Sequence, residues 1–517
     1  MRASGILMPV FSLPGPFGIG TLGKEAFAFV DFLADAKQTY WQILPIGPTG
    51  YGDSPYQSFS AFAGNPYFID YRLLADVGLL TADEVPAARP VGPIDYGALY
   101  NERPVILKKA ADRLLAAPSP SYEAFCEAQS FWLEDYALFM AVKAEQGQAG
   151  LADWPDDLRC RKPEAIAAAK QRLAGAVDYY KAVQFFFYTQ WNALKAYANG
   201  KGVRLVGDIP IYVSPDSSDL WTHPELFQTD GEMHLTQVAG CPPDAFAADG
   251  QLWGNPLYDW PTHKATGFAW WKQRMKHATS IYDVVRIDHF RAFSAYWAVP
   301  AEAETAKEGQ WLDGPKTDFF DAVNRTFKDP KIIAEDLGII DDGVIDLLKK
   351  TQLPCMRVMQ FAFMEGKDNM HMPHNYPKNC VAYTGTHDNN TVLGWLWEAQ
   401  PYEREHALKY CAFPGGDWAV GGSESASCHA IIRTLWQSPA NTVIVPVQDL
   451  CGFGKDTKNE RARRAERQLG VPRHARSSST ASTKVDQRIK RRLLQKQITA
   501  KGRRVSVGFC LCKFPMC

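Results

Sequence analysis

Eight short runs of β-branched and apolar residues recur along the chain, and most are separated by segments long enough to form helices. They span residues 5–10, 39–45, 203–209, 284–288, 331–335, 356–361, 380–384 and 442–446. Continuous apolar runs with helical connections are typical of parallel strands that are buried on both faces. Eight such units predict an α/β fold, the closed (β/α)8 barrel. The alternative is an open doubly wound sheet, which the absence of a glycine-rich phosphate loop after the first run disfavours.

Two long insertions interrupt this alternation. Residues 79–194, between the second and third runs, are rich in Ala, Glu, Lys and Leu, and Leu133, Tyr136, Ala137 and Met140 repeat at helical spacing. We therefore expect a helical subdomain there. Residues 213–265, after the third run, are dense in Pro, Gly, Trp and Asp. They predict loops that form a substrate groove over the mouth of a catalytic barrel spanning residues 1–457.

The charge of the chain is unevenly distributed. Residues 458–517 contain 17 Lys and Arg against 3 Asp and Glu, a net charge of +14, which leaves −15 for residues 1–457 because the whole chain carries −1. An acidic body argues against nucleic acid as a partner. Its 15 Trp and 21 Tyr include rings that suit stacking on sugars.

The cysteines and the lengths of the apolar segments indicate in which cellular compartment the protein is expected. The 11 Cys show neither a CxxC pair nor metal-ligand spacing, which fits free thiols in a reducing compartment. We see no signal peptide and no apolar run of membrane-spanning length. The expectation is a cytoplasmic protein that does not engage a membrane.

Carboxylates follow several predicted strands, at the end where barrel enzymes place their chemistry. Asp208 ends the third run and Asp288 the fourth, the fifth ends in Glu335 and Asp336, and the seventh leads into His387 and Asp388. Arg286 precedes Asp288 by two residues, so both side chains point to one face and Arg286 keeps Asp288 ionised. Each carboxylate alone also fits a structural ion pair, and for Asp208 both readings stay open. Their convergence on one mouth favours a functional site.

These carboxylates suit glycoside cleavage. With retention of configuration, it needs an acid/base and a nucleophile about 5–5.5 Å apart. An ionised Asp288 suits the nucleophile. Glu335 follows an apolar strand, where desolvation raises the pKa of a carboxyl group and suits the acid/base. The sequence alone does not decide whether Glu335 or Asp336 faces the barrel interior.

Seven motifs point to a known family. They are GYGDSPYQS (50–58), GDIPIYV (207–213), PPDAF (242–246), GQLWGNP (250–256), RIDHF (286–290), AEDLG (334–338) and GTHDNN (385–390). With them the chain resembles the 4-alpha-glucanotransferases of the amylomaltase (disproportionating enzyme) family, in the α-amylase clan. The resemblance implies transfer of an α-1,4-glucan segment from a donor maltodextrin to the 4-hydroxyl of an acceptor glucan or glucose. It also implies a covalent glycosyl-enzyme and neither a metal nor an organic cofactor.

The same resemblance assigns residues to roles. It implies Asp288 as nucleophile, Glu335 as acid/base and Asp388 as a third carboxylate that grips and distorts the sugar, with Arg286 and His387 in support. Residues that match the family's glucan groove are Ser54, Tyr56, Asp244, Gln251 and Trp253. Of these, Tyr56 and Trp253 also fit core aromatics. Two other functions remain open: an α-glucan hydrolase with the same carboxylates, and a catalytically impaired maltodextrin-binding protein.

The resemblance ends after Thr457, where the composition shifts to Arg, Lys and Ser without any Trp or Tyr. Codons for residues 458–463, read one nucleotide later, can spell Arg-Met-Asn-Val-Pro-Gly, which matches the family's Arg-Met-Asn-x-Pro-Gly stretch. We interpret residues 458–517 as out-of-frame translation and expect them to be disordered. The alternative is a genuine basic tail that binds nucleic acid or an acidic surface.

Restoring the reading frame after codon 457 should raise both the melting temperature and the activity. A barrel without its last helix exposes the apolar flank of its first and last strands, which lowers stability. Thermal unfolding of the two chains side by side measures the difference, and equal melting temperatures would contradict the prediction. Resequencing codons 450–475 tests the frame shift itself, because an intact frame that encodes the same residues excludes it.

Overall fold

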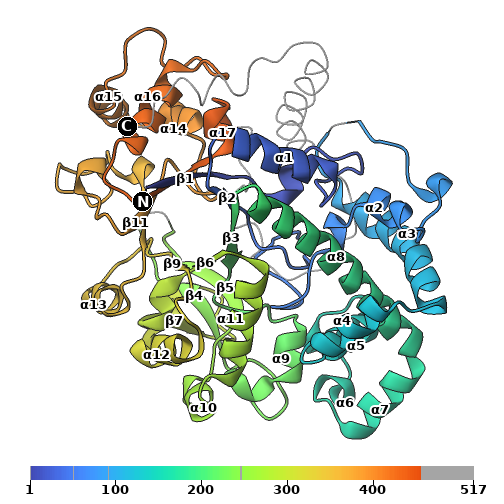
Figure 1. Ribbon diagram of the computed structural model, residues 1–517. Coiled ribbons are helices and arrows are strands. Elements are labelled where there is room, and N and C mark those ends of the chain that lie inside the picture. Colours follow the sequence, from blue (N-terminus) through green and yellow to red (C-terminus); the bar gives the residue numbers. More distant parts are fainter. Residues whose placement is uncertain (1, 51, 91, 245–246, 456–517) are drawn as a thin grey trace.

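A sheet of eight parallel strands forms the centre of the molecule (Figure 1). The structure is a computed structural model that describes residues 2–50, 52–90, 92–244 and 247–455. The strand order is β10-β11-β12-β1-β2-β3-β6-β9. The bounds are β1 (Ala3–Leu7), β2 (Tyr40–Gln42), β3 (Arg204–Ile209), β6 (Val284–Ile287), β9 (Ile332–Ala334), β10 (Cys355–Val358), β11 (Cys380–Tyr383) and β12 (Thr442–Pro446). All eight lie within or overlap the predicted runs.

The two outer strands of this order, β9 and β10, meet and nearly close the sheet. Ala334 N donates a hydrogen bond of 3.0 Å to Pro354 O. One residue pair further on, Met356 N donates to the side chain of Asp336, at 2.6 Å from Oδ1. A carboxylate therefore completes the seam where backbone pairing stops. The predicted (β/α)8 barrel is confirmed.

The barrel interior is filled by apolar side chains from seven of the eight strands. This buried cluster consists of Leu7, Val206, Val284, Ile333, Met356, Val358, Val381, Tyr383 and Ile444. At β2 the interior receives a polar side chain instead, because Tyr383 Oη donates to Gln42 Oε1 at 2.8 Å. A filled interior leaves the C-terminal mouth of the barrel as the place for a site.

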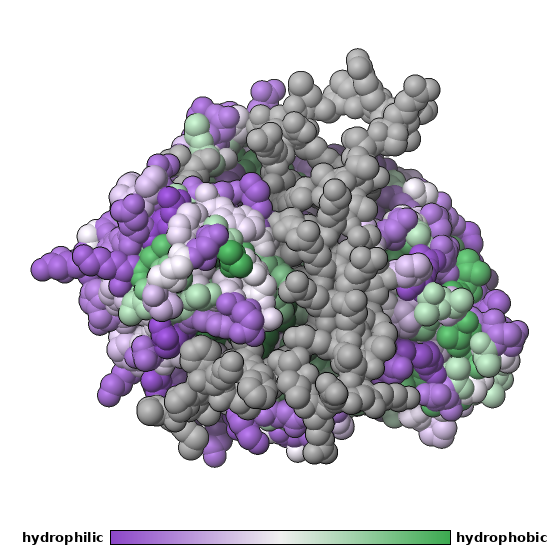
Figure 2. All heavy atoms as spheres, turned by 90° about the horizontal axis from the view of Figure 1, so that it is seen from above, coloured by the Kyte–Doolittle hydropathy of each residue, from purple (hydrophilic) through white to green (hydrophobic). Residues whose placement is uncertain are grey.

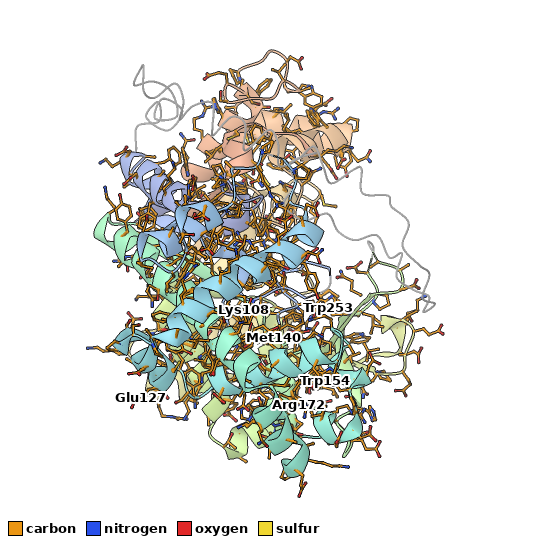
Figure 3. All side chains as sticks on the ribbon, turned by 90° about the vertical axis from the view of Figure 1, so that its right-hand side faces the viewer. Lys108, Glu127, Met140, Trp154, Arg172 and Trp253 are labelled. Carbon is orange, nitrogen blue, oxygen red and sulfur yellow. The ribbon has the colours of Figure 1, made fainter. Side chains whose placement is uncertain are left out.

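The segment between β2 and β3 is helical, as predicted. Its helices are α2 (Tyr71–Asp76), α3 (Tyr96–Ala116), α4 (Pro120–Ala128), α5 (Leu133–Glu145), α6 (Asp156–Arg159), α7 (Pro163–Arg172) and α8 (Ala174–Gly200). Figure 3 views the molecule from their side and marks Lys108 on α3, Met140 on α5 and Arg172 on α7. The long α8 joins this layer to the barrel, since Trp191 Nε1 donates to Ile281 O at 3.1 Å.

A second, antiparallel sheet lies beside the barrel, with the order β5-β4-β7-β8. Its strands are β4 (Gln237–Cys241), β5 (Gln251–Pro256), β7 (Ala295–Pro300) and β8 (Gln310–Asp313). The first two belong to the insertion after β3, which is loop-rich as predicted but also contributes strands that we did not expect. β4 and β5 are short and pair with each other across residues 242–250, a connection too long to give the signal of a tight hairpin turn. β4 also pairs with β7, which follows the intervening β6 in the sequence.

The remaining helices surround the sheets (Figure 1). They are α1 (Lys24–Asp35), α9 (Ser218–Thr222), α10 (Trp260–Ala265), α11 (Ala269–Ile281), α12 (Thr317–Thr326), α13 (Asp342–Thr351), α14 (Val392–Glu398), α15 (Pro401–Tyr410), α16 (Ala426–Trp436) and α17 (Val447–Leu450). In the part of the chain that the structure describes, no helix has both the length and the apolar character needed to cross a membrane.

The surface seen from above is largely hydrophilic where described residues form it, with separate hydrophobic areas (Figure 2). The basic tail that the sequence analysis interprets as out of frame, residues 458–517, lies outside the described residues.

Replacing Gly207 by Ala should destabilise the fold by about 1–3 kcal/mol, the usual cost of overpacking a core. A Cβ at this position of β3 would lie 2.2 Å from the ring of Tyr282, which is buried. Urea unfolding measures the change. Gly175→Ala on α8 is the control, because no atom lies within 4 Å of its added Cβ. Equal unfolding free energies for the two variants would contradict the role assigned to Gly207.

Candidate active site

Asp288 and Glu335 lie on neighbouring strand ends. Each directly follows one residue of the pair Ile287 and Ala334, which are register partners on β6 and β9. Glu335 N donates to Ile287 O at 3.2 Å, and Phe290 N donates to Glu335 O at 3.1 Å, so backbone pairing continues through this point. Neighbouring strands are about 4.8 Å apart, which brings the two carboxyl groups close together at the barrel mouth.

The carboxyl group of Glu335 is buried and held by two backbone donors. Oε1 accepts from Leu337 N and Oε2 from His289 N, both at 2.7 Å. Burial, followed by the negative charge of Asp288, raises the pKa of Glu335 to about 8. Glu335 is therefore protonated at neutral pH while its orientation is fixed.

The next residue, Asp336, points the other way, as alternation along a strand requires. In addition to accepting from Met356 N, it accepts from Arg357 Nη1 at 2.9 Å through Oδ2. Both oxygens are thus engaged at the seam between β9 and β10. Of the two adjacent acids, Glu335 is the one beside Asp288, and Asp336 has structural partners.

Arg286 is a buried guanidinium between two carboxylates. Its Nη1 lies 2.6 and 2.7 Å from the two oxygens of Asp208, and its Nη2 lies 2.9 Å from Asp288 Oδ1. Burial lowers the pKa of Arg286, but Asp208 and Asp288 outweigh it and raise that pKa well above its ordinary value. Asp208 is fully buried, whereas the side chain of Asp288 is 30% exposed. Asp208 therefore anchors Arg286, and Arg286 in turn holds Asp288 at the mouth.

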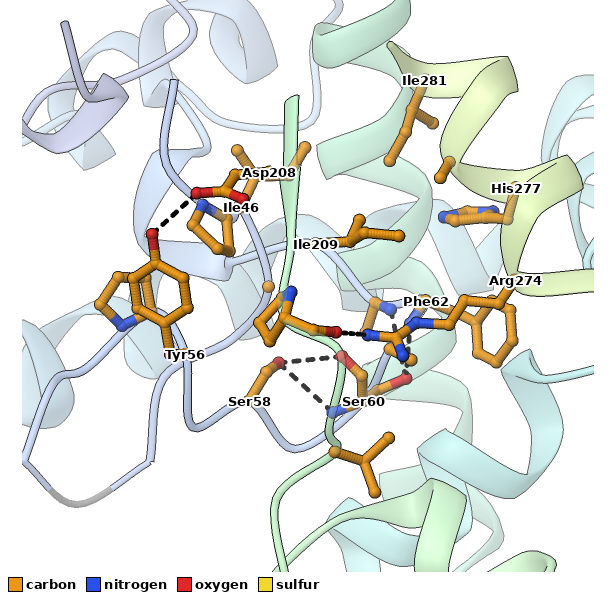
Figure 4. A pocket seen from close by; sticks show the side chains of 18 of the residues that line it. Ile46, Tyr56, Ser58, Ser60, Phe62, Asp208, Ile209, Arg274, His277 and Ile281 are labelled. Carbon is orange, nitrogen blue, oxygen red and sulfur yellow. Dashed lines mark hydrogen bonds between the residues drawn. The ribbon is translucent and has the colours of Figure 1, made fainter. Parts of the chain in front are cut away.

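Tyr56 extends this network to the loop after β11. Its Oη donates to Asp208 Oδ2 at 2.8 Å, a contact drawn in Figure 4, and lies 2.7 Å from His387 Nε2. Burial and the charge of Asp208 raise the pKa of Tyr56 well above its ordinary value, so the phenol keeps its proton. The proton in the second contact then belongs to His387 Nε2. That nitrogen also lies 3.2 Å from Asp388 Oδ1, so polar contacts run from Asp288 through to Asp388.

Among the other predicted groove residues, Trp253 and Ser54 contact residues of the site, and Asp244 has a contact within its own loop. Trp253 contacts the ring of His289 edge-on, at 4.7 Å between centroids, and donates from Nε1 to Gln251 Oε1 at 3.1 Å. Ser54 Oγ accepts from Tyr56 N at 3.4 Å. Asp244 lies in the exposed loop between β4 and β5, where its Oδ1 accepts from Ala247 N at 2.7 Å.

His289 is a site residue that sequence reasoning missed. It adopts a left-handed backbone conformation, with φ 53°, which turns its N–H toward Glu335 while its ring packs on Trp253. Burial lowers the pKa of His289 to about 4, so the ring is neutral. A positive φ in a residue other than glycine leaves no signal in composition or periodicity; the position directly after Asp288 was the available hint.

A small cavity of about 60 Å³ lies behind Tyr56 and Asp208 (Figure 4). Ser58, Ser60, Arg274 and His277 also line it, so the wall is partly polar. It has room for water molecules next to the buried side of the network. Within the described ranges, no group of three or more His, Cys, Asp or Glu side chains has the arrangement of a metal site.

Comparisons with known proteins point to one family. A family model described as 4-alpha-glucanotransferase matches residues 8–475, which extends 18 residues beyond Thr457, where we expected the resemblance to end. The 4-alpha-glucanotransferase of Clostridium butyricum is 44% identical over 460 residues, covering 87% of this chain and 92% of its own. That of Thermus thermophilus is 45% identical over 464 residues, covering 88% and 92%. An amylomaltase from Streptococcus agalactiae, solved in complex with acarbose, superposes with a TM-score of 0.85 at 38% identity, covering 97% of this chain and 99% of its own.

Replacing Asp288 by Asn should lower the pKa of Glu335 from about 8, because it removes a negative charge that disfavours ionisation of the neighbouring carboxyl group. The pKa should stay above the ordinary value of 4.5, because burial is the larger cause. Titration of protein with ¹³C-labelled glutamate carboxyl groups, assigned with Glu335→Gln, measures it. An unchanged pKa in Asp288→Asn would contradict the coupling.

Proposed function

This chain belongs to the 4-alpha-glucanotransferase family, and we propose that Asp288, Glu335 and Asp388 perform its transfer of glucan segments. The observation that carries this proposal is the pair of carboxyl groups on the ends of β6 and β9. One of them is paired with Arg286, and the other has a pKa of about 8. A retaining double displacement requires two neighbouring carboxyl groups, one that attacks as a carboxylate and one that delivers a proton.

In the first step, Asp288 attacks the anomeric carbon of the donor glucan. Glu335 gives its proton to the glycosidic oxygen, the bond from carbon to that oxygen breaks, and the reducing-end fragment leaves with a free 4-hydroxyl. The non-reducing segment stays on the enzyme as an ester of Asp288. Arg286 donates to Asp288 and leaves its exposed side free for the attack.

In the second step, the 4-hydroxyl of an acceptor attacks the same carbon while Glu335, now a carboxylate, takes its proton. The ester bond breaks and Asp288 is released as a carboxylate, so two inversions give net retention. The ester carries no negative charge, so the second cause of the raised pKa of Glu335 is absent at this stage. That makes the carboxylate easier to maintain when the reaction needs a base.

The remaining site residues are proposed to hold the sugar. Asp388, 60% exposed and backed by His387, grips the hydroxyls of the sugar at the bond that breaks. Arg286, His387 and Tyr56 form the wall of this subsite. Ser54, Asp244, Gln251 and Trp253 extend it as a groove, in which Trp253 offers an aromatic face to sugar rings.

We further propose how this unit is organised and where it acts. The catalytic unit is the barrel of residues 1–457 with its insertions at 79–194 and 213–265. Maltodextrins are both donor and acceptor, and neither nucleic acid nor a membrane is a partner. All eight cysteines in the described part of the chain are free thiols, which supports a reducing compartment, the cytoplasm.

Incubation with maltotriose alone should give glucose together with maltodextrins longer than three units. Transfer disproportionates the substrate, whereas hydrolysis gives only glucose and maltose. Separating the products by chain length distinguishes the two, and an absence of longer products would refute transfer. Binding of maltodextrin without any turnover would instead indicate a binding protein.

Variants of Glu335 and Asp288 test the roles of these two residues as acid and nucleophile. Glu335→Gln should lower kcat by about 10²–10⁴-fold, the usual contribution of general acid–base catalysis. Its loss should be smaller for the release of fluoride from α-maltosyl fluoride, because that leaving group needs little protonation. Asp288→Asn should lose activity on both substrates. Equal losses of Glu335→Gln on both would contradict its role as an acid.

A further inference from the structure

The loop of residues 384–391 carries His387 and Asp388, and its position decides where both side chains lie. It begins directly after β11 and ends at α14. Inside the loop, Asn389 Oδ1 accepts from Thr386 N at 2.8 Å and from Thr386 Oγ1 at 2.9 Å. These short-range bonds shape the turn, but they do not attach it to the barrel.

One buried carboxylate attaches both ends of this loop. Asp449, in α17 directly after β12, is 1% exposed. Its Oδ2 accepts from Thr384 Oγ1 at 2.5 Å, and its Oδ1 accepts from Val392 N at 2.7 Å. Thr384 is the first residue after β11 and Val392 is the first residue of α14, so a single side chain fixes the entrance and the exit of the loop.

The strand on the other side of β11 supports the same loop. Gln360, buried in the short 3-10 helix that follows β10, donates from Nε2 to Asn390 O at 2.7 Å and from its backbone N to Thr384 O at 3.3 Å. It packs so closely on Gly385 that a Cβ there would lie 2.6 Å from Nε2. Amide contacts of this kind are neutral, whereas Asp449 offers charge-assisted hydrogen bonds, which are roughly twice as strong.

We propose that Asp449 is a positioning residue for the transfer reaction: by holding Thr384 and Val392 together, it sets the place of Asp388 on the sugar. This rests on the proposed role of Asp388. Asp449 contacts the two ends of the loop and acts on the site through them. A displacement of about 1 Å at a group that grips the reacting sugar can cost up to roughly 10²-fold in rate.

A second buried aspartate provides a matched control. Asp70, also fully buried, accepts from Thr21 Oγ1 at 2.7 Å and from Arg72 N at 2.9 Å, and caps α2 in the helical insertion. These two partners, a threonine hydroxyl and a helix N–H, are of the same kind as those of Asp449. Asp70 also accepts from the guanidinium of Arg72, from Nε at 2.9 Å and from Nη2 at 2.5 Å, so the control removes more contacts than Asp449→Ala does. Asp70→Ala therefore reports what losing such a carboxylate costs the fold alone.

The test compares Asp449→Ala with Asp70→Ala in the full chain, and in the chain with its frame restored. Asp449→Ala should lower kcat for maltotriose about 10- to 100-fold with little change in KM, while Asp70→Ala lowers stability and leaves kcat near the parent. Asp449→Asn should recover most of the loss, because an amide can accept from Val392 N and donate to Thr384 Oγ1. Amide hydrogen exchange in residues 384–392 should accelerate in Asp449→Ala only, a result that does not depend on turnover.

A double-mutant cycle separates positioning from general damage. If Asp449 acts through Asp388, adding Asp449→Ala to Asp388→Asn should change kcat by less than about threefold, since coupled residues are not additive. Multiplying effects, or a loop exchange rate equal to that of Asp70→Ala, would overturn the proposal. If Asp388→Asn alone has the kcat of the parent, the role of Asp388 is refuted, and this inference with it. If Asp388→Asn has a low kcat but Asp449→Ala has the same kcat as Asp70→Ala, only the positioning by Asp449 is refuted.

Discussion

The site depends on one buried guanidinium. Arg286 contacts Asp208 and Asp288 at once, and its side chain is 2% exposed. A buried ion costs several kcal/mol unless its partners satisfy it, so this group is stable only with both carboxylates in place. Asp208 in turn accepts a hydrogen bond from the hydroxyl of Tyr56, which also contacts His387. The arrangement leaves Asp288 paired with Arg286 and exposed on one side, and the contacts that hold Arg286 in place come from β3 as well as from β6.

The barrel seam explains why two adjacent acids have different tasks. Alternation along β9 sends Glu335 and Asp336 to opposite sides. Asp336 bonds to Met356 N and Arg357 at the junction with β10, whereas Glu335 bonds to the backbone N–H groups of His289 and Leu337. The register that closes the barrel is therefore the register that aims Glu335. A shift of one residue would exchange the two side chains and remove the protonated carboxyl group from the mouth.

The sequence is informative where a signal is local or periodic. Each barrel strand is a short apolar run, and several of these runs lead into carboxylates, so the eight strands and the carboxylates after them could be predicted. The choice between Glu335 and Asp336 needed the strand register, and the task of Asp208 needed the position of Arg286 across β3 and β6. The second sheet pairs strands on either side of β6, and the left-handed turn at His289 depends on surrounding structure, so neither leaves a readable pattern. Asp449 followed a predicted strand too, but only its contacts with Thr384 and Val392 connect it to the site.

The carboxylates at the strand ends differ in exposure more than in chemistry. The side chains of Asp208 and Asp336 are 0% and 1% exposed, and Asp449 is 1% exposed, with protein donors on both oxygens of each. Such groups brace neighbouring strands and loops, because a buried carboxylate binds donors most strongly where water cannot compete. Asp288 and Asp388 are 30% and 60% exposed and keep a face toward the mouth. Glu335 combines the two situations: it is braced by two N–H groups, yet burial beside Asp288 raises its pKa to about 8. Bracing fixes where its proton is presented, and the raised pKa ensures that the proton is there.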